Sequence, residues 1–141
     1  REGPLVRIER RIDPYRRRTT MKSCLIVDDS KVIRMVARRI LEGLNFTIDE
    51  AVDGQKALES CTRSMPDAVL LDWNMPVMNG IDFLRKLRLM KGGDAPVVVF
   101  CTTENDLKHI QEAIAAGANE YIMKPFDSEI VEAKFSQAGL L

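Results

Sequence analysis

The sequence has little histidine and cysteine, and it has no long hydrophobic run. Its 141 residues include one His and three Cys. The cysteines, Cys24, Cys61 and Cys101, have none of the paired spacings that hold zinc or mark a disulfide framework, so we expect free, buried thiols in a reducing cytoplasm. No apolar stretch approaches the ~20 residues that span a bilayer. The Arg-rich start also lacks the apolar segment of a secretory signal.

Net charge is absent as well, because 21 basic residues balance 21 acidic ones, but the charge is unevenly spread. Residues 1–20 hold seven arginines against three acids, a net charge of +4, which leaves −4 for residues 21–141. A mildly acidic body does not favour nucleic-acid binding. Met21 directly before the first apolar run is typical of a natural start. We therefore expect residues 1–20 to be a flexible basic extension and residues 21–141 to form one domain.

Two periodicities alternate along residues 21–141. Short unbroken apolar runs predict buried strands, and stretches with apolar residues every three or four positions predict helices. The predicted strands are 24–27, 46–52, 68–71, 97–101 and 120–123. The apolar positions that mark the predicted helices are Ile33, Val36, Ala37, Ile40, Leu41 and Leu44; Ala57, Leu58 and Cys61; Ile81, Leu84 and Leu87; Leu107, Ile110, Ala113 and Ile114; and Val131, Phe135 and Ala138, the last three as an inward stripe. The alternation indicates an α/β fold, a doubly wound five-stranded parallel sheet with helices on both faces.

Polar side chains gather where these predicted strands end. Asp28 and Asp29 follow the first strand, Asp72 the third, Thr102 the fourth and Lys124 the fifth. Ligands of such sheets bind at the carboxyl ends of the strands, at the point where strand order reverses. We therefore expect three acids, a hydroxyl and a lysine to meet at one edge.

Three carboxylates with one lysine are electrostatically unfavourable unless a cation joins them. Oxygen ligands without His or Cys favour a hard ion, and Mg²⁺ takes a few carboxylates together with waters and phosphate oxygens. Asp28, Asp29 and Asp72 supply the carboxylates, and the backbone carbonyl of Asn74 completes the expected ligand set.

A carboxylate beside magnesium can attack a phosphoryl group and form an acyl phosphate. Asp72 is the candidate nucleophile, and Lys124 and Thr102 are placed to contact the other phosphoryl oxygens. Taken singly, each residue has a simpler interpretation: acids cap turns, surface lysines are solvated, and a strand-end hydroxyl bonds its own backbone. The occurrence of all these residues at the ends of neighbouring strands favours a phosphoryl-accepting site over these separate interpretations.

Together, Asp28-Asp29, the stretch 72–76, Thr102 and Lys124-Pro125 resemble the signature of bacterial response-regulator receiver domains over residues 21–141. The resemblance implies a flavodoxin-like three-layer sandwich and a two-component phosphorylation switch rather than an enzyme. A sensor histidine kinase would phosphorylate Asp72 with Mg²⁺ bound. It further implies that Thr102 moves toward the phosphoryl group, that Tyr121 rotates inward, and that the Lys124–Pro125 peptide is cis.

The resemblance also places the output surface at residues 104–126 and a role in phosphoryl lifetime at Asn74 and Glu104. The output would be protein contact by a monomer, without nucleic acid or membrane. The stretch 72–76 is most similar to chemotaxis regulators of the family, so we expect chemotaxis, with a flagellar motor switch protein or a phosphatase as partner. Leu107 stands where motor-binding members often carry lysine, which weakens the motor assignment.

Other interpretations stay open. A phosphate sink and a phosphorelay intermediate share the same site residues. A haloacid-dehalogenase-type phosphatase needs a second acid two residues after its nucleophile, where this chain has Asn74. Nucleotide or flavin binding needs a different loop after the first strand than Asp28-Asp29-Ser30. The single histidine, His109, is expected to be a solvent-facing helix residue.

Overall fold

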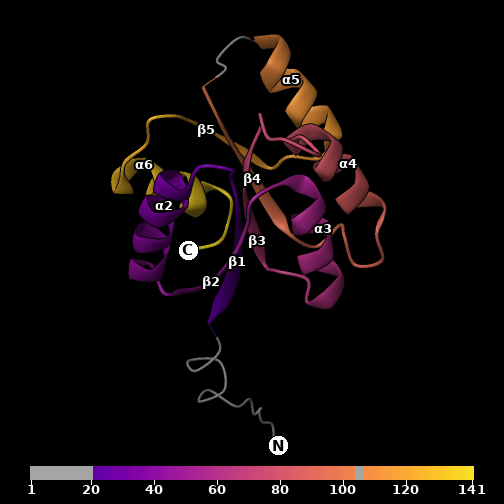
Figure 1. The fold of residues 1–141 in the computed structure, drawn as a ribbon. Coiled ribbons are helices and arrows are strands. Elements are labelled where there is room, and N and C mark those ends of the chain that lie inside the picture. The colour runs from indigo at the N-terminus through magenta and orange to yellow at the C-terminus, as the bar shows by residue number, and fades with distance from the viewer. Residues whose placement is uncertain (1–20, 104–106) are drawn as a thin grey trace, which may run out of the picture.

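The computed structural model describes residues 21–103 and 107–141, in which five strands alternate with five helices (Figure 1). The predicted tail at residues 1–20 and Glu104 lie outside these residues. The strands are β1 (Lys22–Val27), β2 (Phe46–Ala51), β3 (Ala68–Asp72), β4 (Val97–Thr102) and β5 (Glu120–Met123). The helices are α2 (Lys31–Gly43), α3 (Gly54–Arg63), α4 (Gly80–Leu89), α5 (Leu107–Ala116) and α6 (Ser128–Gln137). None of the helices described is long and apolar enough to cross a membrane.

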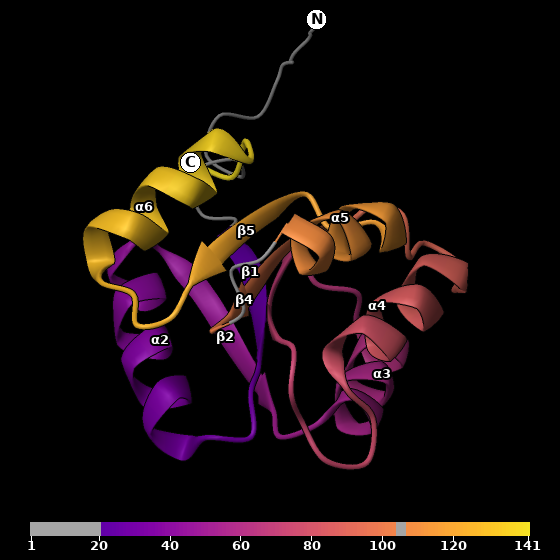
Figure 2. The same ribbon diagram turned by 90° about the horizontal axis from the view of Figure 1, so that it is seen from above.

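The five strands form one parallel sheet in the order β2-β1-β3-β4-β5. Helices α2 and α6 cover one face, and α3, α4 and α5 cover the other (Figures 1 and 2). The chain leaves β1 for β2 on one side and continues to β3 on the other, so the strand order reverses between β1 and β3. The predicted doubly wound, flavodoxin-like α/β fold is confirmed.

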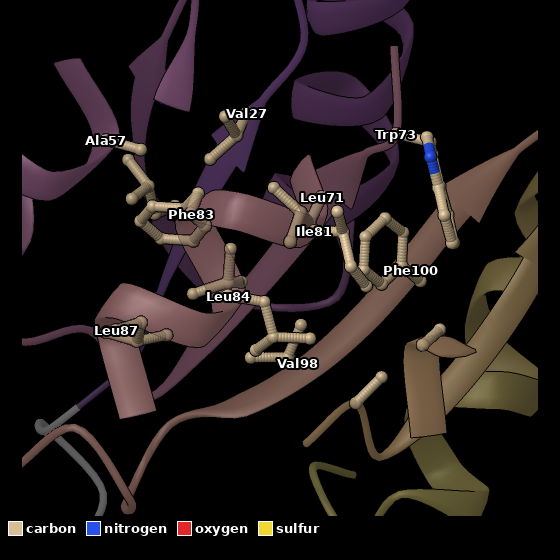
Figure 3. Close-up of a cluster of buried hydrophobic side chains, with 14 of the residues drawn as sticks. Val27, Ala57, Leu71, Trp73, Ile81, Phe83, Leu84, Leu87, Val98 and Phe100 are labelled. Carbon is tan, nitrogen blue, oxygen red and sulfur yellow. The ribbon is translucent and has the colours of Figure 1, made fainter. Parts of the chain in front are cut away.

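Alternate residues of the central strands enter two separate cores, one on each face of the sheet. Beneath α3, α4 and α5, the aromatic rings of Phe83 and Phe100 pack with the aliphatic side chains around them (Figure 3). On the other face, Phe46 meets Phe135 of α6 edge to face, with ring centroids 5.6 Å apart. Both faces of β1, β3 and β4 are thus buried, which explains their unbroken apolar runs.

Polar residues begin four of the helices, each with a side-chain oxygen that accepts from a backbone N–H three residues on. They are Ser30, Asp53, Asn79 and Asp127. Each such cap stabilises its helix by about 1 kcal/mol. The predicted cap at Ser30 is confirmed.

The three cysteines are free and buried, as expected. Burial raises the pKa of the Cys24 and Cys101 thiols to about 12 and that of Cys61 to about 11. These side chains therefore stay protonated at neutral pH and are poor metal ligands.

Some of the apolar residues that mark the predicted helices are exposed. On α5 only Ala113 is buried, while Leu107 is 67% and Ile114 53% exposed. Val36 on α2 is 42% exposed. The helices themselves form as the spacing predicts, but a helix at the side of the sheet buries a narrower stripe than a 3.6-residue pattern marks.

Gly80 lies where the loop after β3 returns against its own strand. A Cβ at Gly80 would lie 2.0 Å from the backbone oxygen of Asp72, which no rotamer relieves. The N–H of Gly80 also donates to the carbonyl of Trp73 at 2.9 Å. This close approach fixes the backbone directly after Asp72.

We expect Gly80→Ala to lower the free energy of unfolding by roughly 1–3 kcal/mol or more, because the methyl group must displace backbone. The control is Gly43→Ala at the exposed end of α2, where nothing lies within 4 Å of the added Cβ. It should be neutral or about 0.5–1 kcal/mol more stable. Urea unfolding of both variants measures the difference, and equal midpoints would contradict the close approach.

Candidate functional site

Four polar residues stand at the carboxyl ends of four strands. Asp72 and Thr102 are the last residues of β3 and β4, Asp28 follows β1, and Lys124 follows β5. Asp28, Asp72 and Thr102 are buried, whereas Asp29 is exposed. The site therefore lies where the strand order reverses, as the sequence predicted.

Lys124 joins two of the acids. Its Nζ donates to Oδ2 of Asp28 at 2.7 Å and to Oδ1 of Asp72 at 3.0 Å. The three side chains are 15%, 4% and 9% exposed, so both ion pairs form largely out of water. Truncating Lys124 would leave both carboxylates buried without their partner, whereas the loss of one carboxylate leaves Lys124 paired with the other.

The acids are close enough to share a cation. Asp28, Asp29 and Asp72 offer carboxylate oxygens that all lie within 4.8 Å of one another. The set contains oxygen donors and no His or Cys, which fits Mg²⁺ better than a soft metal. Asn74 is exposed two residues beyond Asp72. Its backbone carbonyl remains a predicted ligand.

Burial and charge oppose each other in this cluster. Burial raises the pKa of Asp72 above its ordinary value, the charge of Asp28 raises it further, and Lys124 acts in the opposite direction. Burial disfavours the charged ammonium of Lys124, but its hydrogen bonds to Asp28 and Asp72 outweigh this and raise its pKa. The lysine therefore stays protonated. Its single positive charge does not balance the negative charge of the neighbouring carboxylates.

A main-chain hydrogen bond links the ends of β4 and β5, which carry the predicted switch residues Thr102 and Tyr121. The N–H of Lys124 donates to the carbonyl of Thr102 at 2.9 Å. The Lys124–Pro125 peptide is cis, as expected. Tyr121 is half-buried, and its hydroxyl lies 3.5 Å from the sulfur of Met123. The movements of Thr102 and Tyr121 stay predictions.

The single histidine is not solvent-facing, which corrects the prediction. His109 on α5 is half-buried, and its ring lies edge-on to Trp73 with centroids 5.0 Å apart. Trp73 packs in turn on Phe100 at 4.9 Å (Figure 3). The residue after Asp72 thus contacts α5 directly.

Sequence reasoning missed an arginine that touches the site. Nη1 of Arg34 on α2 donates to the backbone carbonyl of Asp28 at 2.9 Å, and its Nε donates to Glu50 at 2.8 Å. The position of Arg34, in the first turn of the helix after Asp28 and Asp29, could have indicated a contact with the site. Its partner Glu50 on β2 is 16 positions away, however, so no local spacing in the sequence pairs Arg34 with Glu50.

The fold and this edge of the sheet define a response-regulator type of α/β domain. The family model described as the response regulator receiver domain matches residues 24–135. The chain belongs to this family.

Relatives and solved structures agree with the assignment. The chain is 38% identical over 115 residues to Protein CcdB of Bacillus subtilis (80% of this chain, 94% of the relative) and 38% identical over 114 residues to Chemotaxis protein CheY of Pseudomonas aeruginosa (80% and 92%). CheY4 of Vibrio cholerae has a similar structure, with a TM-score of 0.80, 31% identity and 84% and 99% of the two chains covered. CheY in a CheX-CheY-BeF3-Mg complex from Borrelia burgdorferi has a TM-score of 0.79 at 26% identity, with 85% and 90% covered. The chain is a CheY-like receiver domain.

We expect Asp72→Asn to stabilise the metal-free chain at neutral pH. With its raised pKa, folded Asp72 keeps its proton to higher pH than unfolded Asp72 does. Stability of the native chain therefore falls, relative to the variant, as pH rises through the folded pKa. Urea unfolding in EDTA from about pH 4 to about pH 8 should show a gain that grows with pH. Asp49→Asn on exposed β2 is the control, and a gain of the same size there would contradict the role of the cluster.

Proposed function

We propose that this receiver domain accepts a phosphoryl group on Asp72 from the phosphohistidine of a sensor kinase. A carboxylate oxygen of Asp72 attacks phosphorus, the P–N bond to the donor imidazole breaks, and the nitrogen keeps the electron pair. The observation that carries the proposal is Lys124 Nζ within hydrogen-bond distance of both Asp28 and Asp72 at the strand-order reversal. The product is an acyl phosphate.

The proposed metal ligands are the carboxylates of Asp28, Asp29 and Asp72 and the backbone carbonyl of Asn74. Magnesium bound there would offset the repulsion between Asp72 and an incoming phosphoryl group. The mutual proximity of the three acids and the raised pKa of Asp72 support this, since the cluster is short of positive charge.

Lys124 and Thr102 are the proposed partners of the transferred group. Lys124 already holds an oxygen of Asp72, so its ammonium is in place for a phosphoryl oxygen on the same side chain. Thr102 ends the neighbouring strand and is 1% exposed, so its hydroxyl is enclosed at the same edge. Tyr121 on β5 is proposed to rotate inward behind Thr102.

We assign signalling to protein contact through residues 107–126, the described part of the predicted output surface. Helix α5 exposes Leu107 and Ile114 there, apolar groups suited to a partner. The similarity to chemotaxis proteins favours a chemotaxis pathway, with a motor switch protein or a CheX-type phosphatase as partner. The second candidate is a phosphate sink or phosphorelay intermediate. Further parts of the proposal are a cytoplasmic monomer, a basic extension at residues 1–20 and a domain at 21–141.

Incubation with Mg²⁺ and acetyl phosphate should add the mass of one phosphoryl group to the native chain. Asp72→Ala should show no adduct, because the attacking oxygen is missing. Intact-mass spectrometry measures both, and hydroxylamine should release the adduct as expected for an acyl phosphate.

The matched control is Asp49→Asn, which removes an exposed acid on β2 that is not one of the proposed site residues and should label like the native chain. An adduct on Asp72→Ala equal to that on the native chain would show that another residue accepts the group. No adduct on the native chain would contradict the proposal.

Millimolar Mg²⁺ should raise the free energy of unfolding of the native chain, because an ion that binds only the folded state stabilises it in proportion to the logarithm of its concentration. At 100 times the dissociation constant the gain is about 2.7 kcal/mol. Asp29→Asn should lose most of the gain, while Asp49→Asn should keep it. Urea unfolding across a Mg²⁺ series measures each gain, and an unchanged gain in Asp29→Asn would remove this acid from the site.

A further inference from the structure

Arg34 joins the site to the edge strand of the sheet. Its guanidinium donates from Nη1 to the backbone carbonyl of Asp28 and from Nε to Oε1 of Glu50 on β2. The arginine side chain is only 14% exposed and that of Glu50 30%, so both bonds are partly shielded from water. Arg34 therefore touches the main chain of a proposed metal ligand and leaves its carboxylate free for other contacts.

Asp28 is fixed at four points. Its N–H donates to Ala51 at 3.1 Å, and its Oδ1 accepts from the N–H of Ser30 at 2.8 Å. Its Oδ2 accepts from Lys124, and its carbonyl accepts from Arg34. Asp28 lies one residue beyond the last paired residues of β1 and β2, so the neighbouring strand holds only its N–H.

We infer that Arg34 is a positioning residue for Asp28, and this inference rests on the proposed magnesium site. Mg²⁺ demands near-ideal octahedral geometry, so a ligand carboxylate must be held in place. Groups that orient metal ligands typically account for 10–100-fold in affinity. Arg34 restrains Asp28 through the backbone carbonyl of Asp28. The hydrogen bond to Glu50 fixes the orientation of the planar guanidinium group of Arg34.

A second arginine provides a matched control. Nε of Arg38 donates to Oε2 of the same Glu50 at 2.7 Å, and its Nη1 donates to Glu42 at 2.9 Å. The bonds found for Arg38 within the described residues reach Glu50, Glu42 and the carbonyl of Ile48, not Asp28. Arg38 thus shares the charge and the acidic partner of Arg34 but lacks the contact with the site.

The charge of Arg34 and its positioning role predict opposite changes in Mg²⁺ affinity when Arg34 is removed. Removing a cation near a divalent metal site reduces repulsion and, by charge alone, tightens Mg²⁺ binding. Removing a positioning group weakens it. Arg34→Lys keeps the charge, but its compact ammonium cannot reproduce the planar fork that spans Glu50 and the carbonyl of Asp28.

The experiment measures the dissociation constant of Mg²⁺ for the whole chain from urea unfolding over a Mg²⁺ series. Each variant is compared with itself in EDTA, so a general loss of stability cancels. We expect about tenfold weaker binding in Arg34→Ala and a clear weakening in Arg34→Lys. Arg38→Ala should bind as the native chain does, or slightly tighter.

Native-like affinity in Arg34→Lys, or equal affinity in Arg34→Ala and Arg38→Ala, would overturn the positioning role and leave the proposed function intact. Should Arg34→Ala fail to fold, Arg34→Lys decides alone against Arg38→Ala. Absence of a Mg²⁺ effect in the native chain would overturn the inference together with the metal site. Labelling by acetyl phosphate then tests separately whether Asp72 is a phosphoacceptor.

Discussion

The ammonium of Lys124 allows two carboxylates to lie buried at one edge of the sheet. Asp28 and Asp72 come from strands 44 positions apart in the chain, and Lys124 binds both from β5. One cation among three neighbouring acids leaves net negative charge, and burial makes that charge costly, as the raised pKa of Asp72 records. The cluster therefore carries unbalanced negative charge, which an additional cation at this edge would offset.

The surrounding structure holds this charged cluster in place. β1, β3 and β4 are covered on both faces by separate apolar cores, so their carboxyl ends are rigidly placed. The close approach of Gly80 to the carbonyl of Asp72 fixes the chain immediately after Asp72. Rigid strands and a constrained exit turn hold the charged groups within hydrogen-bond distance, which flexible loops do not do.

The sequence predicted the elements and the convergence of the site residues, because both follow from short-range patterns and from the geometry of parallel sheets. Apolar runs locate the strands, and the residues after them must share an edge. The Arg34–Glu50 pair and the His109–Trp73 contact were missed because they join different elements across distances that no periodicity encodes. The exposure of Leu107 and Ile114 could not be predicted for a related reason: the pattern marks the apolar face of α5, but the neighbouring elements decide how much of it is covered.

Helix α5 has a contact that the proposed response to a charge change at Asp72 would need. Ala113 is its one buried residue among those described, and an exposed Arg85–Glu112 ion pair at 3.2 Å ties it to α4. Exposed ion pairs contribute little, so the body of α5 depends on few buried contacts, while hydrogen bonds from Arg88 of α4 to the carbonyl of Gly117 hold its C-terminal end. It contacts Trp73, the residue next to Asp72, through His109. A two-state response needs an element in contact with the site whose packing can change, and α5 provides such a contact.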